Sequence, residues 1–320
     1  MSCVRRCVIT VGDFGEFSLV TRIARRLPQG DGVLLGPGDD AALVSAPDGR
    51  VVLSTDLLLE GRHFRRDWSS GQDIGRKAAA QNLADIAAMG ARPTALLVGL
   101  GLPPGTAVAW VDELFDGLCE ECALVGASVV GGDISRSEAV LLGVTALGDL
   151  GGRAPVTRAG ARPSDVVAVA GRLGHAAAGL ALLSAGARGS GPLVDAHRRP
   201  RPPYAMGPRA AELGATAMLD VSDGLLQDLG HVADAGGVRI ELDSAAFAVP
   251  EELRQAAAEL DADPLAWMLT GGDDHALAAT FPAGTGLSGQ WQVIGTVTEG
   301  QGVLVDGREF GKGGWDHFAE

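Results

Sequence analysis

The stretch that decides the fold of this chain is Gly36-Pro-Gly-Asp-Asp-Ala-Ala-Leu43, continued by Val51-Val-Leu-Ser-Thr-Asp56 and followed by Glu60-Gly-Arg-His63. Its two apolar runs, 41–44 and 51–53, are typical of short strands, and a Pro-Asp-Gly turn separates them. We therefore expect two neighbouring strands, with glycines where the backbone must turn or approach another group closely.

Acidic residues flank both expected strands. Asp39 and Asp40 precede the first strand, and Asp56 follows the second. A carboxylate at a strand end is poorly placed for packing but well placed to bind a cation, or a phosphate that a cation holds. A single Gly-Asp-Asp motif is more often a solvated turn. Repetition favours the cation site, because similar clusters next to apolar runs recur at Gly131-Gly-Asp133, Asp220-Val-Ser-Asp-Gly224 and Gly271-Gly-Asp-Asp274.

Composition sets the class of protein. The chain has 320 residues, 46% of them hydrophobic, which is enough for an ordinary core and about two domains. Its 26 basic and 40 acidic residues give a formal net charge of −14, which argues against a nucleic-acid partner and suits a protein that binds cations. No apolar run is long enough to cross a bilayer, so we expect no membrane partner and a cytoplasmic location.

Four cysteines offer an alternative metal site. Cys3 and Cys7, with Cys119 and Cys122, have spacings that could bind zinc. The second pair, however, lies inside a helical pattern rather than in a tight turn, which favours reduced, unpaired thiols.

Helical and strand patterns alternate through both halves of the chain. This predicts an α/β or α+β fold. A glycine-rich segment at 148–152 marks the expected boundary between a domain at 1–150 and a domain at 151–320, and 187–203 is expected to be an irregular connection. Helices are predicted at 16–27, 73–89, 106–126, 175–187, 207–213, 225–235 and 251–260, and further strands at 94–102, 127–130, 139–147, 165–170, 217–221, 238–242, 276–280, 292–297 and 302–305.

Several common chemistries are excluded. The chain has no G-x-x-x-x-G-K-[ST] phosphate loop, no dinucleotide fingerprint and no G-x-S-x-G nucleophile elbow. What remains is a set of carboxylates, and ligands that offer only oxygen select hard cations, Mg2+ above all. Asp85 is included because it shares a helix face with Asn82, three residues earlier. It could equally be a structural residue at the edge of the buried face of that helix. Phosphoryl transfer to an acceptor that is itself a phosphate fits these residues, because such an acceptor needs no catalytic base. The carboxylates are Asp40, Asp56, Asp85, Asp133, Asp220 and Asp223.

Motifs along nearly the whole chain resemble those of the thiamine-monophosphate kinase family. The resemblance implies ATP-dependent phosphorylation of thiamine monophosphate, and the two-domain fold of the aminoimidazole-ribonucleotide synthetase superfamily, in which a mixed N-terminal sheet pairs across a homodimer. The motifs are Gly15-Glu-Phe17, Gly38-Asp-Asp-Ala-Ala42, Ser54-Thr-Asp56, Glu60-Gly-Arg-His-Phe64, Asn82-Leu-Ala-Asp-Ile-Ala-Ala-Met-Gly90, Gly131-Gly-Asp133, Asp220-Val-Ser-Asp-Gly-Leu225 and Trp315-Asp-His-Phe318.

The same resemblance implies roles for individual residues. It gives the N-terminal domain the ATP and Mg2+ sites and the dimer contact, gives the C-terminal domain the completion of the substrate site, and requires no covalent nucleophile or base. Several Mg2+ ions would be held by Asp40, Ser54, Thr55, Asp56, Asp85, Asp133, Asp220 and Asp223. ATP would contact Phe115, Gly132, Asp133, Arg158 and Ser222, and thiamine phosphate would contact His63, Asp273 and Trp315.

Two departures from the family pattern and two other classes of protein bear on this interpretation. The family usually has glutamate where this chain has Asp273, and commonly tyrosine where it has Phe115.

A sister ATP-dependent synthetase of the superfamily would use the same metal and phosphate residues on another acceptor, but His63 and the ending Trp315-Asp-His-Phe318 favour the thiamine substrate. A non-catalytic Ca2+-binding protein is disfavoured, because EF-hand spacing is absent and Arg158 would have no role.

Overall fold

The computed structural model describes residues 8–38, 41–287, 289–310 and 314. The chain forms two compact units, which are described separately here. The first unit comprises residues 1–46, 53–82 and 94–147, and the second comprises 47–52, 83–93 and 148–320. Within the described part, none of the helices combines the length and the apolar character that a membrane crossing requires.

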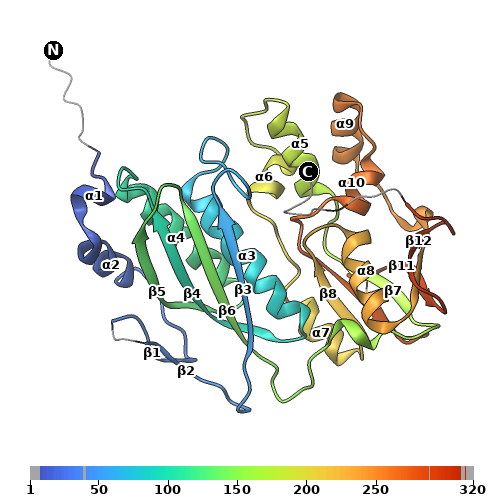
Figure 1. Ribbon diagram of the computed structural model, residues 1–320. Coiled ribbons are helices and arrows are strands. Elements are labelled where there is room, and N and C mark those ends of the chain that lie inside the picture. Colours follow the sequence, from blue (N-terminus) through green and yellow to red (C-terminus); the bar gives the residue numbers. More distant parts are fainter. Residues whose placement is uncertain (1–7, 39–40, 288, 311–313, 315–320) are drawn as a thin grey trace. The chain divides into compact units, whose positions relative to one another are not determined.

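The first unit is built on a sheet with the strand order β3-β6-β4-β5 (Figure 1). β4 and β5 run parallel. Two helices, α3 and α4, pack closely because glycines lie at their contact: a Cβ on Gly75 would be 1.9 Å from the carbonyl oxygen of Leu114. The elements of this unit are α1 (Val11–Phe14), α2 (Glu16–Ala24), β1 (Val33–Leu35), β2 (Leu43–Val44), β3 (Val52–Leu59), α3 (Gly71–Ala88), β4 (Arg92–Leu102), α4 (Val108–Ala123), β5 (Ser128–Arg136) and β6 (Leu141–Asp149), of which α3, β3, β4 and β6 extend past its edge.

The two strands expected from the opening stretch are not neighbours, so that prediction is wrong. β2 pairs antiparallel with β1, a strand that the sequence pattern did not reveal. β3 instead belongs to the larger sheet, where it is next to β6. The predicted strand ends are also wrong, because Asp56 lies inside β3 and Asp133 inside β5.

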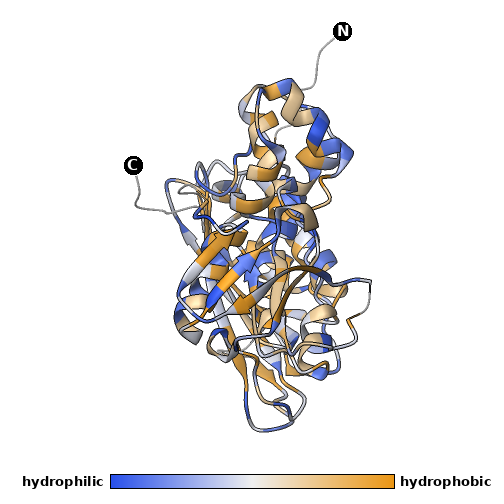
Figure 2. Cartoon of the chain, turned by 90° about the vertical axis from the view of Figure 1, so that its right-hand side faces the viewer, coloured by the Kyte–Doolittle hydropathy of each residue, from blue (hydrophilic) through white to orange (hydrophobic). Residues whose placement is uncertain are grey.

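The second unit contains a larger sheet with the order β12-β9-β11-β7-β10-β8. The pairing is antiparallel except between β12 and β9. Its strands are β7 (Val166–Ala170), β8 (Ala217–Val221), β9 (Arg239–Leu242), β10 (Ala276–Phe281), β11 (Gln292–Thr298) and β12 (Gly302–Val305). Apolar residues, orange in Figure 2, are prominent along the strands. Both faces of the sheet carry buried apolar clusters. Each cluster packs against the apolar faces of helices, and together they form the core of this unit.

Helices of the second unit confirm most of the predicted pattern. Two α-helices and two short 3-10 helices were missed. The α-helix α6 lies inside the segment expected to be irregular, and α10 begins after Asp263, whose side chain accepts a hydrogen bond from the N–H of Leu265. The 3-10 helices η1 and η2 lie where no helix was predicted. The helices are η1 (Arg158–Gly160), α5 (His175–Ser184), α6 (Pro192–Arg198), α7 (Met206–Glu212), α8 (Leu225–Gly236), η2 (Ser244–Ala246), α9 (Glu251–Leu260) and α10 (Pro264–Thr270). The alternation of helices and strands predicted from the sequence is therefore confirmed as a mixed α/β fold.

Candidate functional site

Asp56 is held between β3 and α3 in the first unit. Its carboxylate Oδ2 accepts a hydrogen bond from Gln81 Nε2 at 3.1 Å, and its main-chain N–H donates to Asn82 Oδ1 at 3.2 Å. Asn82 is fully buried and its Nδ2 donates to the carbonyl of Ala78. The neutral Gln81 amide thus orients the half-buried Asp56 carboxylate, while Asn82 holds the main chain of Asp56. A carboxylate held in this way is suited to bind a cation.

The neighbours of Asp56 on β3 lie on alternate faces of the sheet. Successive side chains in a strand point to opposite faces, so Ser54 shares a face with Asp56 and Thr55 does not. The Thr55 hydroxyl donates to the carbonyl of Val144 at 3.0 Å and accepts from Thr145 Oγ1 at 3.1 Å. The Thr55 hydroxyl is therefore engaged with β6 on the face opposite Asp56.

Asp133 follows a bulge in β5. Leu96 pairs with Val129 and Leu97 with Gly131, so Val130 has no position opposite it. A Cβ on Gly132 would be 1.9 Å from the carbonyl oxygen of Val98, which excludes any side chain there. The Asp133 carboxylate is exposed and accepts a hydrogen bond from Ser135 Oγ at 3.0 Å. This segment thus combines a bare backbone with an accessible charge.

The structure places the other predicted nucleotide residues in contrasting surroundings. Phe115 is on the buried face of α4, and only 5% of its surface is exposed. Arg158, in η1 of the second unit, is exposed, and Ser222 is half-buried directly after β8.

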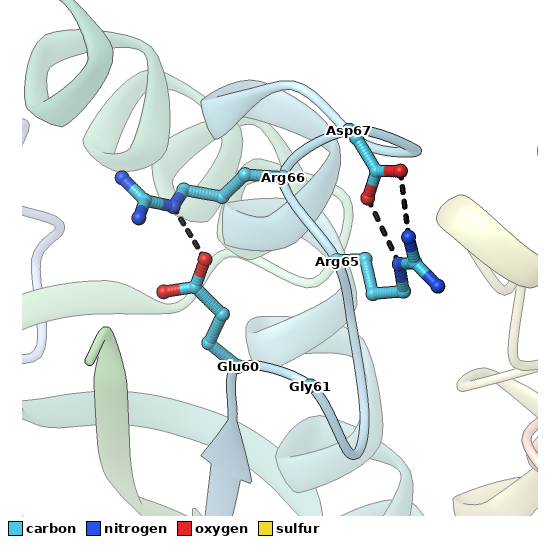
Figure 3. A pocket seen from close by; sticks show the side chains of 5 residues that line it. All are labelled: Glu60, Gly61, Arg65, Arg66 and Asp67. Atoms are coloured by element: carbon cyan, nitrogen blue, oxygen red, sulfur yellow. Dashed lines mark hydrogen bonds and ion pairs between the residues drawn. The ribbon is translucent and has the colours of Figure 1, made fainter.

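The loop that joins β3 to α3 carries His63. His63 Nδ1 accepts a hydrogen bond from the main-chain N–H of Leu59 at 3.0 Å. A pocket of about 640 Å3 opens on this loop. Figure 3 shows the two ion pairs in its wall, Arg66 with Glu60 and Arg65 with Asp67. The pocket is lined by Glu60, Gly61, Arg65, Arg66 and Asp67.

In the second unit, Asp220 pairs with a buried histidine. Asp220 lies near the end of strand β8, and its Oδ2 is 3.0 Å from Nδ1 of His275, with both side chains buried. Burial disfavours the charged imidazolium, but the hydrogen bond and charge of Asp220, with the charges of Asp273 and Asp85, raise the pKa of His275. A cationic His275 therefore compensates the carboxylates around it.

Asp223 lies in a loop that a second buried acid organises. The Asp228 carboxylate accepts hydrogen bonds from the main-chain N–H groups of Asp223 and Gly224, at 3.0 and 3.1 Å. Burial raises the pKa of Asp228 to about 7, and the charges of Asp220 and Asp223 add to the shift. Three carboxylates thus lie close enough to influence one another at the start of α8.

Asp273 and Asp274 differ although they are adjacent. Asp273 has a left-handed backbone (φ 68°), donates its N–H to the carbonyl of Ser222, and has a half-exposed carboxylate 3.9 Å from His197 Nδ1. Asp274 is 5% exposed and accepts from the N–H of Ala176, in the first turn of α5, at 3.0 Å. Burial raises the pKa of Asp274 to about 7. Only Asp273 is placed to meet a ligand from solvent.

The oxygen donors of both units fit Mg2+ in chemical type. Among the described residues, no three His, Cys, Asp or Glu side chains are grouped so that they could hold a metal ion by themselves. Mg2+ does not need such a group, because it usually binds through one or two carboxylates, with water and substrate phosphates completing its shell. Asp56 on β3 and Asp133 on β5, the two edge strands of the sheet, each offer one carboxylate of this kind.

Some site residues were predicted from the sequence and others were missed. Asp40 and Trp315 lie outside the described residues. Gln81, Asp228 and His275 were missed. A carboxylate five residues after Asp223, in the first turn of a predicted helix, was a usable signal for Asp228. The partnership of His275 with Asp220 left no local signal, because 55 residues separate them.

Comparison with known proteins identifies the family. The models for AIR synthase related protein match this chain with their N-terminal domain at residues 38–150 and their C-terminal domain at 162–307. Thiamine-monophosphate kinase of Mycobacterium tuberculosis is 52% identical over 97% of this chain and 94% of its own length, and that of Corynebacterium glutamicum is 43% identical over 91% and 88%. A crystal structure of AaThiL complexed with AMPPCP and TMP is similar with a TM-score of 0.80 and 34% identity, over 98% of this chain and 100% of that one. This chain therefore belongs to the thiamine-monophosphate kinase family and has its AIR synthase-like fold.

Proposed function

We propose that this protein transfers the γ-phosphate of ATP to thiamine monophosphate and so forms thiamine diphosphate. The observation that carries the proposal is the 52% identity to the Mycobacterium tuberculosis kinase over nearly the whole length of both chains. The similar structure that contains AMPPCP and TMP supports the same pair of substrates, because AMPPCP is an analogue of ATP.

A coupled assay of ADP release tests this activity. We expect ADP release with Mg2+ and ATP to require thiamine monophosphate, and thiamine diphosphate to form in equal amount. Thiamine without its phosphate is the control acceptor. ADP release at the same rate without thiamine monophosphate would contradict the proposal.

We further propose that several Mg2+ ions support the reaction. The ions would neutralise charge on the phosphates during transfer. In the first unit the proposed ligands are the half-buried Asp56, the exposed Asp133, Ser54 on the same face as Asp56, Thr55 and Asp40. In the second unit the proposed ligands are Asp85, Asp220 and Asp223. Activity should vanish with EDTA and return with added Mg2+.

The remaining residues of the proposed site bind the two substrates. The bare backbone at Gly132, beside Asp133, suits close approach by a phosphate group, and the exposed Arg158 and half-buried Ser222 offer further phosphate contacts. Phe115 is proposed near the nucleotide, where its buried ring would act through packing. Thiamine phosphate is assigned to His63, Asp273 and Trp315, with the half-exposed Asp273 carboxylate suited to the cationic ring of thiamine.

Transfer is proposed to be direct, without a phosphorylated protein intermediate. Phosphate is a nucleophile in its own right near neutral pH, so the chain needs only to position it. Incubation with γ-labelled ATP and no acceptor should leave the protein unlabelled. Label on the protein that passes into thiamine diphosphate would show a covalent intermediate instead.

We propose that two copies of the chain pair through the first unit's sheet. One face of this sheet exposes leucines on three strands, and Leu57 and Leu97 lie over glycines of neighbouring strands, Gly143 and Gly131. An exposed apolar face of this kind marks a protein contact. Light scattering on the purified protein should give twice the chain mass, and Leu57→Asp should give the monomer. The exposed leucines are Leu53, Leu57, Leu97 and Leu141.

The same proposal extends to the domains and the compartment. Residues 1–150 would provide the dimer contact with ATP and Mg2+ binding, and 151–320 would complete the substrate site. An enzyme that consumes ATP works where ATP is abundant, so we place the protein in the cytoplasm. Fractionation of cells that express a tagged chain tests the location.

A further inference from the structure

The loop that carries His63 is folded back on itself. The N–H groups of Arg62 and His63 both donate to the carbonyl of Leu59, and the N–H of Gly61 donates to the carbonyl of Phe64 at 2.8 Å. The Phe64 side chain is buried and anchors the far side of the turn. The backbone around His63 therefore has little freedom once these hydrogen bonds are formed.

A hydrogen bond at the base of the loop fixes the proton on the His63 ring. Leu59 N–H donates to Nδ1, so Nδ1 must carry a lone pair rather than a proton. The proton of the neutral ring then lies on Nε2. His63 can consequently donate a hydrogen bond through Nε2 to a phosphate oxygen or a ring nitrogen, but it cannot accept one there.

Glu60 connects this loop to the first residues before β6. Its main-chain N–H donates to the carbonyl of Val140 at 3.0 Å, and its carboxylate Oε2 accepts from the N–H of Val140 at 3.1 Å. The other carboxylate oxygen, Oε1, accepts from Arg66 Nε at 2.6 Å (Figure 3). One side chain thus ties together the residues on both sides of His63 and a neighbouring strand.

The Arg66–Glu60 pair is too exposed to be explained by stability alone. The Arg66 side chain is 40% exposed, and ion pairs of that exposure contribute little to folding. A carboxylate that accepts from Arg66 on the loop and from Val140 before β6 does, however, limit where the loop can move. Its effect should therefore appear in the geometry of His63 rather than in the free energy of unfolding.

We propose that Glu60 and Arg66 are positioning residues: they hold the loop in which the N–H of Leu59 keeps His63 as the Nε2–H tautomer, so that the ring donates a hydrogen bond to the phosphorylated substrate. The substrate's identity rests on the proposed function, but the tautomer does not. Asp67 supplies a contrast in the same pocket, because its ion pair with Arg65 joins residues only two apart in the sequence.

The first test compares Glu60→Gln with Asp67→Asn, because both remove one negative charge and one ion pair from the same pocket. We expect Glu60→Gln to raise the KM for thiamine monophosphate about 10-fold, with the KM for ATP unchanged. Asp67→Asn should change neither constant. The Glu60→Gln side chain keeps an acceptor for the N–H of Val140, and Arg66→Gln perturbs the same pair from the other side if Glu60→Gln fails to fold. Equal effects of Glu60→Gln and Asp67→Asn would overturn the proposal.

The second test reads the tautomer directly in the full chain without substrate. Two-bond 1H–15N NMR correlations, assigned with a His63→Gln variant, should show His63 protonated only on Nε2 in the wild type and as a mixture in Glu60→Gln. A wild-type ring protonated on Nδ1 would overturn the proposal. Because this measurement needs no turnover, a protein that fails to phosphorylate thiamine monophosphate would contradict the proposed function and leave the tautomer result standing.

The third test uses two amides that each copy one ring nitrogen. In His63→Gln the amide N–H lies near the position of Nε2, whereas in His63→Asn it lies near that of Nδ1. We expect kcat/KM for thiamine monophosphate to be about 10-fold higher for His63→Gln than for His63→Asn. The opposite order would show that Nδ1 meets the substrate.

Discussion

The acidic residues of the two units are treated in opposite ways. In the first unit, Asp56 and Asp133 are accessible and are held by neutral partners, the Gln81 amide and the Ser135 hydroxyl. In the second unit, Asp220, Asp228 and Asp274 are buried and are compensated by His275, by main-chain N–H groups or by a raised pKa. Only in the second unit are these acidic side chains balanced by groups of the chain itself.

This difference shows two ways in which a protein can contain many carboxylates and still fold stably. An accessible carboxylate keeps its hydration, so it can remain charged until a cation arrives. A buried carboxylate must be paired, hydrogen-bonded or protonated, because an isolated charge in the interior is costly. Substitutions in the first unit should therefore change activity, and those in the second unit should change stability as well.

The largest effect is expected at Asp56. Asp56→Asn keeps an acceptor for Gln81 but removes the charge, so turnover should fall about 1,000-fold while the free energy of unfolding changes by less than about 0.5 kcal/mol. Steady-state kinetics and urea denaturation measure the two quantities. Asp116→Asn, in a surface ion pair with Arg26 of the same unit, is the control. Near-normal turnover in Asp56→Asn would remove Asp56 from the metal site.

Asp274 should show a strong pH dependence of stability. Its folded pKa of about 7 lies above the ordinary value of 3.8, so its stabilising contribution is complete below pH 3.8 and is lost as the pH rises through 7. Compared with Asp274→Asn, the wild type should lose about 3 kcal/mol of unfolding free energy between pH 5 and pH 8.

Urea denaturation at the two pH values measures this loss. Asp243→Asn removes a carboxylate from an exposed helix cap in the same unit and serves as the control. If the unfolding free energies of Asp274→Asn and the wild type changed in parallel with pH, burial would not raise the pKa of Asp274.

Asp220 should combine both kinds of effect. Asp220→Asn leaves His275 buried without its charged partner, so the free energy of unfolding should fall by about 2 kcal/mol in the absence of Mg2+ and nucleotide. A double-mutant cycle with His275→Asn isolates the pair, since the second substitution should cost less once the first is present. Additive losses would contradict a direct interaction.

The smallest effect is expected at Asp273, whose carboxylate is half-exposed. Asp273→Glu should leave the KM for thiamine monophosphate equal to or below the wild-type value, because the longer side chain still carries the charge. The left-handed backbone at position 273 suits aspartate slightly better than glutamate, so Asp273→Glu should lower the free energy of unfolding by less than about 1 kcal/mol. Asp273→Ala should raise the KM for thiamine monophosphate and not that for ATP. A change in the ATP constant alone would place Asp273 on the nucleotide side.

Local patterns in the sequence were enough to predict most elements but not their pairing. Periodicity located α3, α8 and β8 to within a few residues, since it depends only on nearby side chains. It placed 41–44 beside 51–53, whereas β2 pairs with β1, because pairing depends on contacts between distant segments. The same limit applies to the site: Asp56 and Asp133 could be chosen from their motifs, but the burial of Asp274 and the partnership of Asp220 with His275 depend on tertiary packing.

The helix α4 carries two cysteine thiols whose reactivity is lowered by burial. Burial raises the pKa of Cys119 to about 11 and that of Cys122 further still. At neutral pH almost none of either side chain is the thiolate that reacts with alkylating reagents. Once Cys3 and Cys7 are replaced by serine, a cysteine introduced at an exposed position such as Asp67 should therefore accept a maleimide fluorophore with little background. The loop around His63 could then be followed by single-molecule fluorescence without rebuilding the interior of the protein.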